Sequence, residues 1–152
     1  MSLMKQFLLL LFIGTSTMLF AQEEYNLTGG YIADSYDVVS YFKNEKPLKG
    51  TKKYQTTFNG AKLKFSSEEN LAIFKENPNK YMPQCGGFCA YAVAVKGERV
   101  SINPKTFEIR DGKLYLFYNS WGTNTLALWQ KEGAEQLKIK ADKNWIKIKN
   151  SK

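Results

Sequence analysis

The chain has 152 residues, with 22 lysines and arginines against 14 acidic residues, which gives a formal net charge of +8, and it contains no histidine. Without an imidazole, Ser–His and Cys–His nucleophile pairs are excluded. The 43% of hydrophobic residues can form one packed core, and two cysteines are too few to staple a disulfide-dense miniature fold.

Residues 1–21 are expected to be a secretory signal peptide. Lys5 gives this segment its positive end, residues 7–13 are an unbroken apolar run, and Ala21 is the expected cleavage site. The apolar run is shorter than the roughly 20 residues that a membrane-spanning helix needs. We therefore predict an exported protein, periplasmic or extracellular, that is not an integral membrane protein after cleavage. The positive charge favours an anionic envelope component as a partner, and export argues against nucleic acid.

The remaining chain is predicted to hold one domain, because it is too short for two. Residues 22–30 are expected to be a flexible lead-in, and residues 31–149 the domain itself. Asp34 or Ser35 is a candidate cap for a short helix at the start of this domain, since both residue types satisfy free backbone N–H groups there.

A β-hairpin is predicted over residues 52–65. Apolar and polar residues alternate on both sides of Asn59-Gly60, and this pattern is the strongest short-range hairpin signal. A helix is expected next, because Ser66 and Glu69 match a capping box. The helix should end at Asn77-Pro78, since a residue before proline avoids the helical conformation.

The second half of the chain alternates between strand and helix signals. Residues 90–95 are apolar and fit either a strand or a short helix. Strands are expected around Asn103-Pro104, and a second hairpin around Asp111-Gly112. Two amphipathic helices separated by Gly133 should follow. The predicted fold is α+β: a single small domain of short antiparallel β-hairpins packed with three to five helices.

The most informative segment holds three sulfur atoms within eight residues. Met82, Cys85 and Cys89 surround the pair Gly86-Gly87. An exported protein meets oxidising conditions, so a Cys85–Cys89 disulfide is one interpretation, and a diglycine turn could close it. Thiolate and thioether groups also select soft metals, so a copper(I) or zinc site is another. Thiol–disulfide exchange is a third, although three intervening residues depart from the usual redox spacing.

Several motifs resemble a known family. Gly60, the run Leu63-Lys64-Phe65-Ser66-Ser67, Phe74 and Asn77-Pro78 with Lys80-Tyr81 resemble a YHS domain, and residues 83–93 are similar to the continuation in exported stand-alone YHS-domain proteins. YHS domains accompany metal-transporting ATPases and some oxygenases, so the resemblance implies metal handling. The family is named for a tyrosine, a histidine and a serine, and this chain has no histidine.

From these observations we predict an exported binding domain rather than an enzyme. A soft metal ion, copper(I) or zinc, is the expected ligand, with Cys85 and Cys89 as thiolate ligands and Met82 as a third. One alternative is a thiol-dependent enzyme or enzyme accessory that works through Cys89 or through Asp34 and Asp37. Another is a structural interaction module that uses the basic C-terminal helices and keeps the two cysteines as a plain disulfide.

Overall fold

The computed structural model describes residues 24–43 and 46–151, so the predicted signal peptide lies outside the described residues. The helices are α2 (Ser40–Lys43), α3 (Glu68–Glu76), α4 (Pro78–Tyr81), α5 (Ala90–Lys96), α6 (Thr125–Glu132) and α7 (Ala134–Asn150). The strands are β1 (Leu27–Thr28), β2 (Tyr31–Ile32), β3 (Thr51–Phe58), β4 (Ala61–Phe65), β5 (Asn103–Arg110), β6 (Lys113–Phe117), β7 (Asn119–Ser120) and β8 (Thr123–Asn124).

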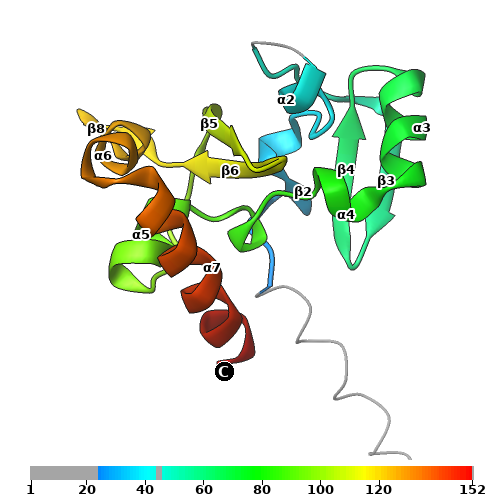
Figure 1. Ribbon diagram of the computed structural model, residues 1–152. Coiled ribbons are helices and arrows are strands. Elements are labelled where there is room, and N and C mark those ends of the chain that lie inside the picture. The colour runs from blue at the N-terminus through cyan, green and yellow to red at the C-terminus, as the bar shows by residue number, and fades with distance from the viewer. Residues whose placement is uncertain (1–23, 44–45, 152) are drawn as a thin grey trace, which may run out of the picture.

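The first half of the chain forms a four-stranded sheet in the order β1-β2-β4-β3 (Figure 1). The hairpin of β3 and β4 was predicted and is confirmed, with Asn59 and Gly60 at φ +48° and +83° in its turn. Both values are positive, as a two-residue hairpin turn of the right twist requires. β1 pairs with β2, so part of the predicted lead-in belongs to this sheet.

Helix α3 begins one residue later than the capping-box pattern predicts. Ser67, not Ser66, is the N-cap, and its Oγ accepts a hydrogen bond from the Asn70 amide at 3.1 Å. The choice of Ser66 was therefore wrong. The reason is that the Ser66 hydroxyl donates to Asp37, 29 residues earlier in the chain, at 2.6 Å.

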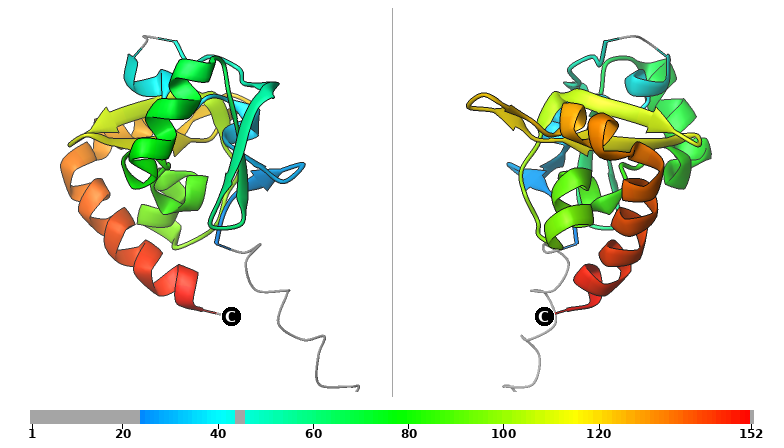
Figure 2. Two further views of the ribbon diagram at one scale, coloured as in Figure 1. Left: turned by 90° about the vertical axis from the view of Figure 1, so that its right-hand side faces the viewer. Right: turned by 60° about the vertical axis from the view of Figure 1, so that its left-hand side comes forward.

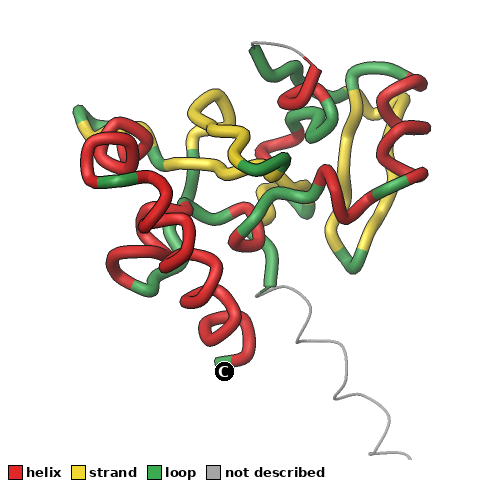
Figure 3. Tube along the Cα trace, viewed as in Figure 1, coloured by secondary structure: helices red, strands yellow, loops and turns green. Residues whose placement is uncertain are grey.

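The second half contains the predicted hairpin of β5 and β6, together with helices α5, α6 and α7 (Figure 3). Residues 90–95, which fitted a strand or a helix, lie in α5. Gly133, at φ +109°, separates α6 from α7 as predicted. Within the described residues there are six α-helices rather than three to five, because α2 and α4 are single turns of four residues and show no helical period. The α+β class is confirmed.

Strand β6 connects two hydrophobic cores. Its residues Leu114 and Leu116 pack into a core with β2, β4 and α3, whereas Tyr115 and Phe117 pack into a second core with α5, α6 and α7. All four side chains are fully buried. Side chains of a strand alternate between its two faces, so β6 joins both cores into one domain. Figure 1 shows this hairpin between the β3–β4 sheet and the C-terminal helices.

Among the helices of the described residues, none is both long enough and apolar enough to cross a membrane.

Candidate functional site

The sulfur-containing segment lies at the junction of the two cores. Met82 packs in the first core and Cys85 in the second, and both are buried. Between them the chain is extended, and the Gln84 amide donates to the Leu114 carbonyl of β6 at 2.8 Å. The structure therefore places the sulfur atoms of Met82 and Cys85 in different cores.

The diglycine bend is a tight turn, as the sequence suggested. Cys85, Gly86 and Gly87 have φ values of +55°, +59° and +80°. A Cβ at Gly86 would clash with the carbonyl oxygen of Glu24 and would lie 2.7 Å from the ring of Trp145. Because glycine has no Cβ, it lets the N-terminal segment cross directly over the bend.

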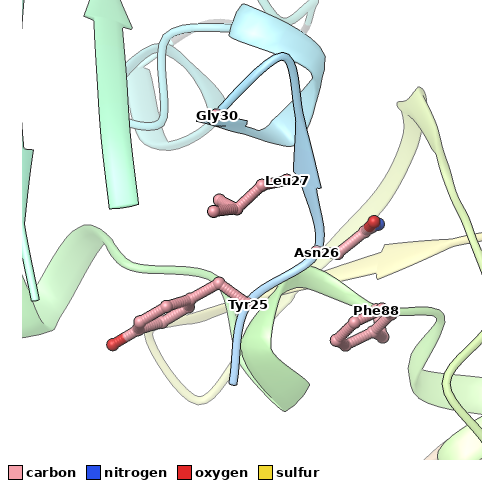
Figure 4. A pocket seen from close by; sticks show the side chains of 5 residues that line it. All are labelled: Tyr25, Asn26, Leu27, Gly30 and Phe88. Carbon is pink, nitrogen blue, oxygen red and sulfur yellow. The ribbon is translucent and has the colours of Figure 1, made fainter. Parts of the chain in front are cut away.

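The N-terminal segment is fastened to this bend. The Asn26 amide donates to the Gly86 carbonyl at 2.8 Å, and the Asn26 side chain donates to the Gly87 carbonyl at 3.1 Å. A shallow pocket of about 350 Å³ lies at the crossing. Its lining residues are Tyr25, Asn26, Leu27, Gly30 and Phe88 (Figure 4).

Both cysteines are free thiols and both are buried. The disulfide that the sequence left as one alternative is therefore not present in the structure. Burial raises the pKa of the Cys85 thiol well above its ordinary value, and the nearby charges of Asp142 and Cys89 raise it further. Cys85 consequently stays protonated at neutral pH, which opposes a role as a nucleophile.

Cys89 belongs to a short hydrogen-bonded chain. The Thr125 hydroxyl donates to the Tyr118 carbonyl at 2.8 Å. The hydroxyl hydrogen of Thr125 is engaged in this bond. In the 3.3 Å contact between Cys89 Sγ and Thr125 Oγ1, the thiol is therefore the donor and the hydroxyl oxygen the acceptor. The Cys89 side chain is thus held in place by Thr125 at the N-cap of α5.

A pocket of about 380 Å³ opens beside Cys89. It lies between α5, α6 and the segment that leads into the β7–β8 hairpin. Its lining residues are Cys89, Tyr91, Ala92, Lys96, Val100, Tyr118, Thr123, Thr125 and Leu128. The lining is chiefly apolar, with the Thr125 hydroxyl at the bottom beside Cys89 and the exposed Lys96 at the edge. Such a size and composition are typical of small-molecule sites.

Of the residues that line this pocket, only Cys89 is a candidate site residue from the sequence. Thr125 directly follows the N-cap of α6, Asn124, whose side chain accepts from two backbone amides. Lys96 ends α5 and looks like an ordinary basic residue at a helix C-terminus. No local pattern distinguishes these residues, because they meet only through the packing of α5 against α6.

The donor set does not fit a zinc site. Within residues 24–43 and 46–151, no group of three or more cysteine, aspartate or glutamate side chains is placed to hold a metal ion. A structural zinc site needs four ligands. The two cysteines flank the diglycine bend, Cys85 in the second core and Cys89 at the N-cap of α5, and both are buried.

Asp34 and Asp37, the candidate acid–base pair, have separate structural partners. Asp34 accepts a hydrogen bond from the Thr28 hydroxyl at 2.6 Å in an exposed position. Asp37 is fully buried, and its Oδ1 accepts from the amides of Val39 and Ser40, at 2.9 and 3.2 Å. It therefore caps the turn before α2, which is the role that the sequence assigned to Asp34 or Ser35.

Residues 39–85 match the family model of the YHS domain. The chain therefore carries a YHS-domain segment, which covers just under a third of it and includes α2, β3, β4, α3 and α4. The match ends at Cys85, so every lining residue of the pocket beside Cys89 lies beyond it. No curated protein and no solved structure gave a significant match.

Proposed function

We propose that the protein is an exported, non-enzymatic binding domain that holds a small, largely apolar and negatively charged ligand in the pocket beside Cys89. The observation that carries this proposal is the pocket itself: about 380 Å³ of space with an apolar lining and few polar groups. Ligand sites of soluble domains have this composition, in which a small number of polar groups fix the orientation of the ligand.

The polar groups indicate the chemistry of the ligand. Lys96 lies at the pocket edge and attracts an anion. At the bottom, the Thr125 oxygen donates once and accepts once from Cys89, which leaves one lone pair for a ligand donor. The ligand class is therefore an aromatic or aliphatic body with one acidic group. The same geometry argues against a thiol-dependent enzyme, because the Cys89 S–H group donates a hydrogen bond to Thr125 and no carboxylate is among the described residues that line the pocket.

An anionic aromatic dye, anilinonaphthalene sulfonate, tests the proposal, because it has both an apolar body and an acidic group. We expect saturable binding of one dye per chain to the folded protein. Leu128→Trp should abolish this binding by filling the pocket. Lys96→Gln should weaken it about five- to ten-fold through loss of a charge-assisted contact. Lys113→Gln, on an exposed strand residue, is the matched control and should bind as the wild type does.

Equal dye binding by the wild type and the Leu128→Trp variant would refute the pocket as the site. Circular dichroism and the melting temperature establish that each variant is folded. A loss of binding in the Lys113→Gln control would show that general charge, rather than Lys96, attracts the dye, and would remove the argument for an acidic ligand.

A second candidate function is copper(I) binding by Cys85 and Cys89. Two observations support it: both thiols are free, and the YHS-domain segment suggests a metal-related role. Copper(I) accepts thiolate ligands, and its binding would release the two thiol protons. Titration of the reduced protein with copper(I), against the Cys85→Ala/Cys89→Ala variant, tests this candidate. Equal affinity of the two proteins would refute it.

Export is part of the proposal and rests on the sequence of residues 1–21. The expected mature protein begins at Gln22. Intact-mass measurement of the protein expressed in a bacterium with a secretory pathway tests this: a mass that retains residues 1–21 in the secreted fraction, or no secretion at all, would contradict it.

A further inference from the structure

The longest helix, α7, has an apolar inner side and an unusual outer side. Leu137 and Ala141 are buried in the second core. Ile139 and Ile146, in contrast, are 52% and 60% exposed. They are seven residues apart, or about two helical turns, and so lie on the same side of the helix. Figure 2 shows α7 at the outside of the molecule, with one side of the helix not covered by any other helix or strand of the described chain.

Lysines surround the two isoleucines. Lys140, Lys143 and Lys147 are exposed on the same side of α7. We call these five residues, Ile139, Lys140, Lys143, Ile146 and Lys147, the lysine–isoleucine face.

The acidic residues of α7 do not neutralise this face. Asp142 accepts a hydrogen bond from the Tyr115 hydroxyl at 3.1 Å and forms an ion pair with Lys138 at 3.4 Å. Neither partner belongs to the lysine–isoleucine face. Glu135, in the first turn of the helix, pairs with Arg110 of β5 at 3.3 Å. The lysine–isoleucine face therefore carries uncompensated positive charge around exposed apolar side chains.

We propose that the lysine–isoleucine face docks the protein on the surface of an anionic lipid bilayer. Lysines attract the headgroups, and the isoleucines enter the boundary between headgroups and acyl chains, as in interfacial helices. A second copy of the chain does not fit, because pairing two such faces would bring like charges together. A polyanion such as nucleic acid would form ion pairs with the lysines, but it offers no apolar environment in which the isoleucines could be buried. This proposal is independent of the pocket beside Cys89.

The expected effects can be scaled. A lysine near an anionic bilayer contributes about five-fold to the partition coefficient, so the loss of three should lower partitioning about a hundred-fold. Each isoleucine is already about half buried, so burying the rest should contribute a further five-fold or so. The lysine contribution should also fall steeply as the salt concentration rises.

Partitioning of the full chain onto vesicles with about one third anionic phosphatidylglycerol, compared with pure phosphatidylcholine, tests the proposal. The variants are Lys140→Gln/Lys143→Gln/Lys147→Gln and Ile139→Gln/Ile146→Gln. The charge-matched control is Lys52→Gln/Lys75→Gln/Lys113→Gln, which removes three exposed lysines elsewhere. All variants retain the N-terminal apolar run, so its contribution is common to them.

A fluorophore at the face reports docking directly. We expect an environment-sensitive dye on Ile139→Cys to shift to shorter wavelength on anionic vesicles, and the same dye on Lys52→Cys to stay unchanged.

Three results would overturn the proposal. The first is wild-type partitioning by the triple lysine variant of α7. The second is equal binding to neutral and anionic vesicles. The third is unchanged vesicle binding by the isoleucine variant together with loss of heparin binding by the lysine variant, which would identify a polyanion surface instead of a bilayer surface.

Discussion

Substitution of Asp37 by asparagine should destabilise the fold. Asp37 is fully buried, and Oδ1 accepts hydrogen bonds from the amides of Val39 and Ser40. Oδ2 accepts from the amide and the hydroxyl of Ser66 and from the Asn70 side chain, all at 2.6–2.8 Å. A single carboxylate thus ties the start of α2 to the start of α3.

The magnitude follows from counting donors. Asparagine has nearly the same shape but replaces one acceptor oxygen by an NH₂ donor. The less costly orientation turns the NH₂ group toward the amides of Val39 and Ser40. The Ser40 amide still donates to the Asp37 backbone carbonyl at 3.0 Å, so the Val39 amide is the one backbone donor left unpaired there. A buried unpaired donor costs about 1–3 kcal/mol, so the substitution should cost about 1–3 kcal/mol. This is a sizeable part of the total stability of a small domain, which is about 5–15 kcal/mol.

Urea unfolding measures the change. We expect a lower midpoint for Asp37→Asn with an unchanged m-value, because the folded structure should remain the same. Asp34→Asn is the matched control: its exposed carboxylate accepts from Thr28, and its loss should change the free energy of unfolding by less than about 0.5 kcal/mol. A cost below about 1 kcal/mol for Asp37→Asn would refute the view that this carboxylate holds the two helix starts together.

Three further predictions concern the bend and its thiols. Gly86→Ala should lower the melting temperature far more than Gly112→Ala, because both glycines have positive φ but only a Cβ at Gly86 meets other atoms; equal shifts would contradict this. Stability should fall above about pH 9 through Cys85 and also above about pH 10 through Tyr115, because burial raises the pKa of both groups and the unfolded chain releases their protons first. Each group then contributes a loss of about 1.4 kcal/mol per pH unit, and urea unfolding of Cys85→Ala should show a shallower loss than the wild type. Ellman's reagent should react slowly with the folded protein and sooner with Cys89, which lines the pocket, than with Cys85; rates measured on the single-cysteine variants in the reverse order would contradict the pocket geometry.

The elements that could be predicted from the sequence are those whose conformation is determined by residues adjacent in the chain. Asn59-Gly60 and Asp111-Gly112 each adopt positive φ values, and each closes the hairpin that the alternating pattern predicts. Gly133 likewise ends α6. In these cases the local backbone preference and the tertiary structure agree, so a short stretch of sequence contains enough information.

The errors arise where a distant partner competes with a local one. Ser66 could cap α3, but the buried Asp37 takes its hydroxyl, and Ser67 becomes the cap. Asp34 could cap the first helix, but Asp37 accepts the amides there. A buried carboxylate needs donors from every direction, and the sequence does not show which of several nearby serines and aspartates will be buried.

Strand β6 explains why Met82 and Cys85, only three residues apart in the sequence, lie in different cores. Met82 precedes an extended stretch that bonds to β6, and Cys85 follows it, so the strand separates their side chains into two cores. Three extended residues can span about 10 Å, which exceeds the reach of a shared metal ion. If copper(I) binds the two cysteines, Met82→Leu should therefore leave its affinity within about two-fold of the wild type, since leucine conserves the core volume. A ten-fold weaker affinity would mean that the chain rearranges around the metal and that the separation by β6 is not maintained when metal binds.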